Sequence, residues 1–173
     1  MKNLILFVIV FLISFTLSAQ TKLYKGLYAG MTRREAQAEF KKHKDQYTVV
    51  KFGLFQYRLF MFNNQYDNEG KLFQIGFVEN WANMRGVQSE GIDRLRDFVR
   101  FAKENGYTSD GVSVGASEFQ FDKNGQYLFI SPEKDKFIKL TFSPDESGSA
   151  VATIWIGSYS MGGKNVVYKT NDF

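Results

Sequence analysis

The chain has 173 residues, with 22 Lys and Arg against 18 Asp and Glu, and it contains no cysteine. This length suits one domain that buries roughly two thirds of its unfolded surface. The missing cysteine excludes disulfides and a lipid attached to an N-terminal cysteine. The net charge of +4 is too small to indicate a nucleic-acid partner.

Residues 1–19 have the pattern of a secretory signal peptide. Lys2 gives a positive start, residues 4–13 form an unbroken apolar run, and small residues follow just before position 20. The run is shorter than the roughly 18 apolar residues that a spanning helix needs. We therefore expect an exported protein, periplasmic or secreted, whose single domain covers residues 20–173 and has no transmembrane segment. An uncleaved N-terminal anchor is the alternative.

The first expected helix spans residues 33–44. Gly30 can break the preceding segment, and Thr32 and Glu35 have the spacing of a Thr-x-x-Glu capping box. A narrow apolar stripe predicts that this helix lies on a sheet, and it consists of Ala36, Phe40 and His43. A basic flank runs beside the stripe and consists of Arg33, Arg34, Lys41 and Lys44.

Charge is distributed unevenly along the chain. Residues 20–58 hold nine basic and three acidic side chains, net +6, whereas residues 59–173 hold twelve and fifteen, net −3. One interpretation is that the two parts complement each other within the fold. The other is a basic face that binds an acidic partner or a membrane surface.

Two segments after this helix, residues 47–52 and 55–62, are rich in β-branched and aromatic residues and are expected to be strands. Residues 67–70, Asp-Asn-Glu-Gly, have the composition of a tight turn rather than of a calcium loop. Beyond it, Phe73, Ile75 and Phe77 alternate on one face of a third strand. Together these segments predict an antiparallel meander.

The strongest helical periodicity lies in residues 89–105. Ser89 can cap the start, Asn105 and Gly106 form a stop signal, and Tyr107 can fold back on the last turn. The apolar stripe of this helix consists of Ile92, Leu95, Phe98, Val99 and Ala102.

The remaining segments are expected to be strands and turns. The strands are residues 118–121, 126–131, 137–142 and 150–159, and the turns are residues 122–125, 132–135 and 144–149. The tail, residues 162–173, either adds an edge strand or stays loose. The predicted fold is therefore α+β, with two helices packed on a largely antiparallel sheet of six to eight strands.

An internal repeat is a further prediction. Residues 66–75 and 121–130 share the pattern aromatic-Asp-x-x-Gly followed by Ile, and they lie 55 positions apart. The two expected helix caps, Thr32 and Ser89, lie 57 positions apart. This spacing predicts two tandem helix-plus-meander units at about residues 28–85 and 86–160. Independent use of the same hairpin residues is the alternative.

The segment 29–40, AGMTRREAQAEF, resembles the Gly-Met-Thr/Ser-x-x-Glu-Ala/Val opening of a family of small envelope α+β modules. The family includes a small lipoprotein of outer-membrane assembly and, in tandem form, the β-lactamase inhibitor protein. The resemblance implies helices on one side of an antiparallel sheet and binding to other proteins. It covers about a dozen residues and the order of the elements, lacks the lipidated cysteine, and transfers no functional residue.

Candidate catalytic groups are sparse. His43 is the only histidine and stands between Lys42 and Lys44, which disfavour a bound cation. Carboxylates are scattered along the chain, as Glu79, Glu90, Glu118 and Glu133. Since cysteine and a Gly-x-Ser-x-Gly motif are also missing, we expect a protein that is not an enzyme and holds no metal or cofactor. A carboxylate-based hydrolase is the alternative.

Residues 79–88, ENWANMRGVQ, form the best candidate binding loop. Trp81, Met84 and Arg85 stand there among small polar residues, and Trp and Arg are frequent at protein interfaces. The alternative is that Trp81 folds back onto the core.

The expected function is an exported, non-catalytic module that binds another envelope or secreted protein through its sheet face or the 79–88 loop. The alternative is a protein that binds a small molecule or glycan through exposed aromatic side chains of the sheet face.

Overall fold

The computed structural model describes residues 20–47, 49–59, 64–81, 87–109, 126–144 and 150–161. The helices are α2 (Arg33–Lys42), α3 (Lys44–Tyr47) and α4 (Val87–Glu104). The strands are β1 (Lys22–Tyr24), β2 (Leu27–Tyr28), β3 (Val50–Phe52), β4 (Phe55–Leu59), β5 (Gln65–Tyr66), β6 (Leu72–Trp81), β7 (Thr108–Ser109), β8 (Gln126–Ile130), β9 (Lys136–Pro144) and β10 (Ala150–Ser158).

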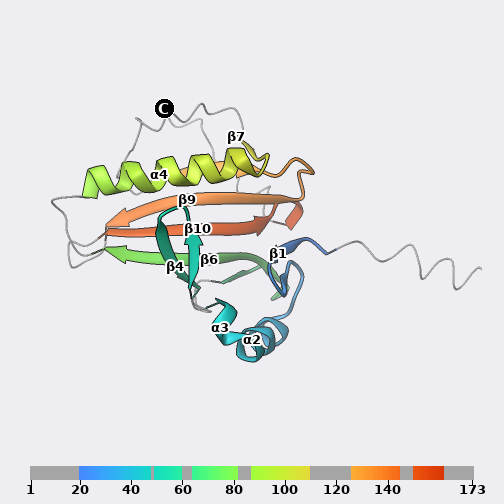
Figure 1. Ribbon diagram of the computed structural model, residues 1–173. Helices are drawn as coiled ribbons and strands as arrows, with labels where there is room; N and C mark the ends of the chain where they lie inside the picture. Colours follow the sequence, from blue (N-terminus) through green and yellow to red (C-terminus); the bar gives the residue numbers. More distant parts are fainter. Residues whose placement is uncertain are drawn as a thin grey trace, which may run out of the picture.

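One antiparallel sheet dominates the fold. Its eight strands include seven in the order β3-β4-β6-β10-β9-β8-β7, with β5 paired to β6, while β1 and β2 form a separate two-stranded ribbon. Figure 1 shows α4 lying along one side of this sheet, and α2 and α3 on the opposite side of the molecule. The predicted α+β class with an antiparallel sheet is confirmed.

The strand order is symmetric about its centre. Strands β3, β4 and β6 pair in sequence on one side, and β8, β9 and β10 pair in sequence on the other. The last strands of the two sets, β6 and β10, pair from Trp81 with Ala150 to Gln74 with Gly157. The tandem units at residues 28–85 and 86–160 stay a prediction, and this order is what such units would produce.

The first helix begins as expected and ends early. The Thr32 hydroxyl accepts from the Glu35 N–H, and the Glu35 carboxylate accepts from the Thr32 N–H, so the capping box is confirmed. The predicted extent of residues 33–44 is wrong, because the backbone of His43 (φ −127°, ψ 35°) leaves the helical region. Lys44 therefore lies on α3 rather than on α2.

The second long helix is confirmed with a corrected start. It begins at Val87, so Ser89 lies inside the helix and is not its cap. Its end matches the expectation: Gly106 has φ +74°, its N–H donates to the Lys103 carbonyl, and the Tyr107 N–H donates to the Ala102 carbonyl at 2.9 Å. This pair of bonds is a Schellman motif.

The long strands also agree with the sequence, whereas some boundaries do not. The strand expected from residue 47 begins at Val50, because Tyr47 belongs to α3. At the turn of residues 67–70, Asp67 Oδ1 accepts from the N–H groups of Glu69 and Lys71, and Gly70 has φ +74°. The segments 60–63, 118–125, 145–149 and 162–173 lie outside the described residues.

The core lies on the inner face of the sheet, beneath α4 and the β1–β2 ribbon. Leu95 and Phe98 of α4 are buried, and the Phe98 ring meets that of Phe129 edge-on at 5.7 Å. The inner face is built from alternate residues of the central strands, namely Ile75, Phe77, Ile138, Leu140, Ile154 and Ile156. No helix within the described ranges is long and apolar enough to cross a membrane.

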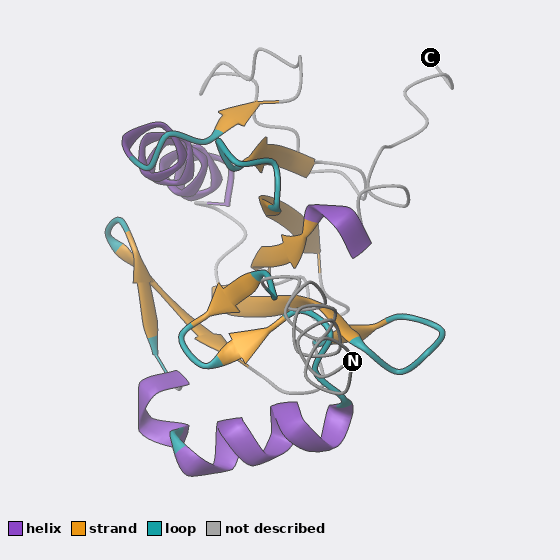
Figure 2. Cartoon of the chain, turned by 90° about the vertical axis from the view of Figure 1, so that its right-hand side faces the viewer, coloured by secondary structure: helices purple, strands orange, loops and turns teal. Residues whose placement is uncertain are grey.

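A chain of aromatic rings joins α2 and α3 to the sheet. Phe40 stacks on Tyr47 at 5.8 Å, Tyr47 meets Tyr24 at 6.1 Å, and Tyr24 meets the buried Phe77 of β6 at 5.0 Å. Figure 2 shows the two helices at the bottom of the molecule, with the strands between them and α4. The β1–β2 ribbon thus links α2 and α3 to the sheet through side chains, while the segment before α2 is bonded directly to the start of β6, with the Leu72 N–H donating to the Met31 carbonyl.

Tyr47 also fixes this link through its hydroxyl, which donates to Glu39 Oε1 at 2.8 Å and accepts from the Gly26 N–H at 3.1 Å. Burial, with the bond to Glu39 second, raises the pKa of Tyr47 to about 12. The ring is fully buried. One side chain therefore holds α2, α3 and the β1–β2 turn together.

Replacing Tyr47 by Phe is expected to lower the free energy of unfolding by roughly 1–3 kcal/mol at neutral pH, because two polar groups lose their partner. The raised pKa means that the unfolded chain loses the phenolic proton first. Stability should therefore fall as pH rises from about 10 toward about 12, and less steeply in Tyr47→Phe. Urea unfolding across this pH range tests the loss of stability and its pH dependence. The control is Tyr28→Phe, at a partly exposed position. Identical pH profiles for wild type and Tyr47→Phe would contradict the assignment.

Candidate interaction site

The structure places both ends of the candidate binding loop. Strand β6 ends at Trp81, whose backbone pairs with Ala150, and α4 begins at Val87. The Trp81 side chain, Met84 and Arg85 lie outside the part of the chain that the structure describes. Their role in binding stays a prediction.

A buried ion pair connects the two flanks of this loop. Glu79 Oε2 of β6 accepts from Arg94 Nε of α4 at 2.7 Å, and the side chains are 18% and 4% exposed. The Arg94 guanidinium also lies over the Phe55 ring of β4, 4.2 Å from its centroid. Arg94 thus joins β6, α4 and the β3–β4 hairpin.

The tip of that hairpin is attached to α4 one turn further along. Phe52 pairs with Phe55, which leaves Gly53 and Leu54 as the two turn residues. The Leu54 N–H donates to Asp97 Oδ2 at 2.7 Å, while its side chain is 85% exposed. Gly53 has φ +62°, and a Cβ there would collide with the Asp97 side chain, so the turn favours glycine.

The charges around this attachment are internally paired. The other oxygen of Asp97 accepts from Arg100, and the Asp97 side chain is 8% exposed. Tyr57 lies buried among these groups, and its pKa is raised far above the usual range, first by burial and then by the charge of Glu79. We call the set Glu79, Arg94, Asp97 and the hairpin tip 53–55 the α4 clamp.

The α4 clamp could not be read from the sequence as a unit. The residues Phe52-Gly-Leu-Phe55 carry a hairpin signal, because a glycine stands in a two-residue turn between two strand-forming aromatics. Neither Leu54 nor Arg94 was singled out in the sequence, since nothing local brings the hairpin to α4.

The remaining carboxylates are not brought together. Glu133 lies in the exposed turn between β8 and β9, whereas Glu79 lies beside Ala152, toward the other end of the sheet. The Glu90 side chain and Glu118 lie outside the described residues. Among the residues that are described, no three His, Asp or Glu side chains form a group that could hold a metal ion.

The basic flank is exposed, but it is divided between two helices. Arg33, Arg34 and Lys41 lie on α2 and Lys44 on α3. The Arg33 guanidinium lies 4.9 Å from the centroid of the Tyr66 ring. His43 stands at the break between the helices, partly exposed, with Nδ1 3.4 Å from Gln46 Nε2.

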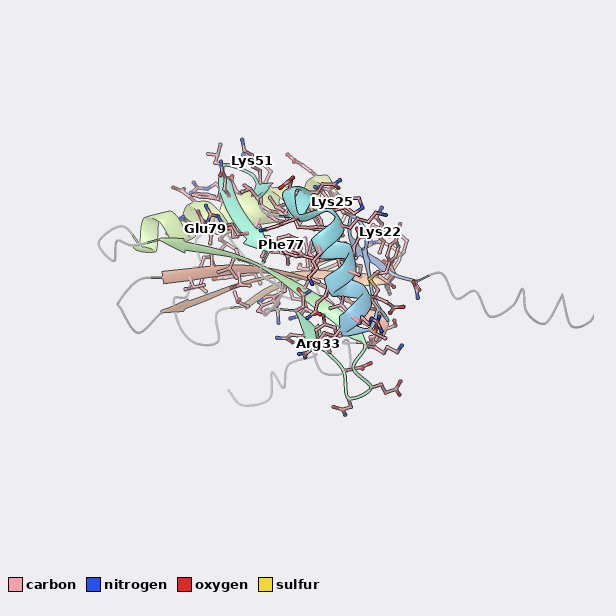
Figure 3. All side chains as sticks on the ribbon, turned by 90° about the horizontal axis from the view of Figure 1, so that it is seen from below. Lys22, Lys25, Arg33, Lys51, Phe77 and Glu79 are labelled. Carbon is pink, nitrogen blue, oxygen red and sulfur yellow. The ribbon has the colours of Figure 1, made fainter. Side chains whose placement is uncertain are left out.

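Figure 3, which looks onto α2, shows further basic side chains around this helix pair, with Lys22, Lys25, Arg33 and Lys51 labelled. We call the set of exposed cations on and beside α2 and α3 the basic face. It consists of Lys22, Lys25, Arg33, Arg34, Lys41, Lys42, Lys44 and Lys51.

Trp155 lies on the face of the sheet opposite Ile154 and Ile156, because neighbouring residues of a strand point to opposite faces. It is partly exposed, and its Nε1 donates to Thr141 Oγ1 at 3.0 Å. Lys139 Nζ lies 5.7 Å from the ring centroid. Trp155 is therefore part of the outer face and not of the core beneath α4.

Comparison of the chain with protein-family models, with curated proteins and with solved structures found no match, so the resemblance to small envelope α+β modules stays a prediction.

Proposed function

We propose that this chain is an exported, non-catalytic module that binds another envelope or secreted protein through the end of the molecule formed by Leu54 and the loop after Trp81. The observation that carries the proposal is Leu54. Its side chain is 85% exposed, yet its backbone is bonded to the buried Asp97. An apolar side chain held outward on a fixed turn is suited to insertion into a partner's pocket.

The α4 clamp also means that this end of the molecule would lose little conformational entropy when a partner binds. The hairpin tip is fixed to α4 by Asp97, and the flanks of the candidate loop are joined by Glu79 and Arg94. A preorganised surface loses less conformational freedom on association than a free loop does. In this proposal Trp81, Met84 and Arg85 contribute large side chains to the same contact with the partner.

The arrangement of the carboxylates favours binding over hydrolysis. Glu79 and Asp97 each have an arginine partner, Arg94 and Arg100. A carboxylate pair that hydrolyses glycosides needs two groups that both reach the substrate. Glu79 and Asp97, which are held in ion pairs, instead position α4 and the hairpin tip.

The finer architecture that accompanies this function is a tandem pair of helix-plus-meander units, each with its helix against the sheet. The symmetric strand order about β6 and β10 supports it, as do the aromatic contacts of Phe98 and Tyr47. In this arrangement the loop after Trp81 connects the two units.

A pull-down from an envelope extract tests the function. Tagged residues 20–173 should recover a partner that Leu54→Ser and Trp81→Ala/Arg85→Ala lose, whereas Val49→Ser, a control at the residue before β3, retains it. Val49 is 44% exposed, so the control removes a comparable apolar side chain. Equal recovery by all four proteins would contradict the proposal, as would a full-length chain that stays in the cytoplasm with residues 1–19 attached.

The second candidate function is glycan binding on the outer face of the sheet. It is favoured by Trp155, whose partly exposed ring lies next to Thr141 and Lys139. Sugars commonly stack on such rings. Quenching of tryptophan fluorescence by oligosaccharides, lost in Trp155→Phe, would support this function over protein binding.

A further inference from the structure

We propose that the basic face docks on an anionic phospholipid surface. The face shares no residue with the α4 clamp, although Lys51 lies on the same β3–β4 hairpin, and the inference goes beyond the proposed protein binding. The face combines cations from α2, α3, β1 and β3 that lie far apart in the sequence and surround one helix pair (Figure 3). Lipid is the occupant that its charge and composition fit.

The acidic side chains of this region do little to cancel the basic face. Between residues 20 and 58 there are three acids against nine basic residues. Glu35 bonds to the Thr32 N–H and hydroxyl at the start of α2, and Glu39 accepts from the buried Tyr47. These carboxylates and Asp45 keep their charge, so residues 20–58 are left with a net charge of +6.

The composition of the face fits a diffuse anionic surface. Six of its eight residues are lysine, which acts as a hydrated point charge, and two are arginine, which is the residue of choice for bidentate recognition of one carboxylate. On α2, Ala36 is buried and Phe40 partly buried, and the exposed positions are mostly charged or polar. Docking would therefore be peripheral and electrostatic, without insertion of an apolar helix face.

The framework under these charges is fixed. Lys25 Nζ donates to the Gln46 carbonyl at 2.6 Å, which ties the β1–β2 turn to α3. The Tyr47 hydroxyl ties the same turn to α2 through Glu39. A fixed framework keeps the cations on one surface and lets them act together on a charged plane.

The distribution of charge along the chain orients this face toward a bilayer, because residues 20–58 carry net +6. Residues 59–173 carry net −3. An anionic surface would attract the first part and repel the second, which selects one orientation.

Vesicle sedimentation tests the proposal with residues 20–173. The probes are phosphatidylcholine vesicles with and without about one quarter phosphatidylglycerol. Wild type should bind only the anionic vesicles and should be released as NaCl rises from about 0.05 M to about 0.5 M. The variant Arg33→Gln/Arg34→Gln/Lys41→Gln should bind at least about tenfold more weakly, since each cation near the surface contributes roughly fivefold.

The matched control is Arg96→Gln/Lys103→Gln/Lys134→Gln, which removes the same charge from exposed positions outside the basic face. It should keep affinity within about twofold of wild type, because Arg96 and Lys103 lie on α4, on the opposite side of the molecule from α2 and α3 (Figure 1), and Lys134 lies in the turn between β8 and β9. Equal losses in both variants would overturn the assignment to this face. Failure of wild type to bind anionic vesicles would overturn it too, and binding of soluble polyglutamate instead would assign the face to an acidic protein.

Discussion

Arg94→Ala is expected to lower the free energy of unfolding by about 3–5 kcal/mol, the cost of breaking a buried ion pair on one side. Arg94 is 4% exposed and bonds to Glu79, which is 18% exposed. Alanine would leave the Glu79 carboxylate without this partner and remove the guanidinium from the Phe55 ring. Urea unfolding followed by far-ultraviolet circular dichroism measures the loss.

The matched control lies two residues along the same helix. Arg96 pairs with Asp93 at 2.8 Å, but both side chains are more than half exposed. Arg96→Ala should therefore cost no more than about 1 kcal/mol. The double variant Glu79→Gln/Arg94→Met should recover much of the loss, because it removes both charges. A loss for Arg94→Ala as small as that for Arg96→Ala would show that the pair is not buried in solution.

Phe77→Ala should have a similarly large effect, with a loss of about 3–5 kcal/mol in the free energy of unfolding. Phe77 is fully buried at the sheet end of the aromatic chain, 5.0 Å from the Tyr24 ring, and it also lies 5.9 Å from the Phe52 ring. The cavity would separate the β1–β2 ribbon from β6. We therefore also expect amide hydrogen exchange in α2 and α3 to become faster.

Phe101→Ala serves as the comparison, because it makes the same chemical change at a partly buried position. Its ring contacts Phe52 at 5.3 Å from the α4 side. The loss should be clearly smaller than for Phe77→Ala, and exchange in α2 and α3 should stay unchanged. If both variants accelerated that exchange equally, the aromatic chain would not be the link between the helices and the sheet.

Local features were predictable because the interacting groups are neighbours in the chain. The Thr32–Glu35 box spans three residues, and the motif at Gly106 and Tyr107 closes within the last turn of α4. The turn at Asp67 and the alternation in β6, β9 and β10 depend on equally short distances. Patterns of this kind can be recognised directly from the sequence.

Other boundaries were missed for equally physical reasons. Nothing in the residue type of His43 marks the end of a helix. The backbone leaves helical geometry there, and Tyr47 on α3 packs against Phe40 and Tyr24. Strands β1, β2, β5 and β7 have two or three residues each, too few to show an alternating pattern. Trp81, Met84 and Arg85 stay a prediction from their residue types alone.

The sequence by itself determined the α+β class, the start of α2, the end of α4 and the long antiparallel strands, since each follows from contacts within a few residues. Only the tertiary structure decided the α4 clamp, whose bonds join residues 15 and 43 positions apart, Glu79 with Arg94 and Leu54 with Asp97. The same holds for the basic face, which collects cations from four elements. Such partners are selected by how the sheet packs against its helices, and that packing is a property of the whole chain.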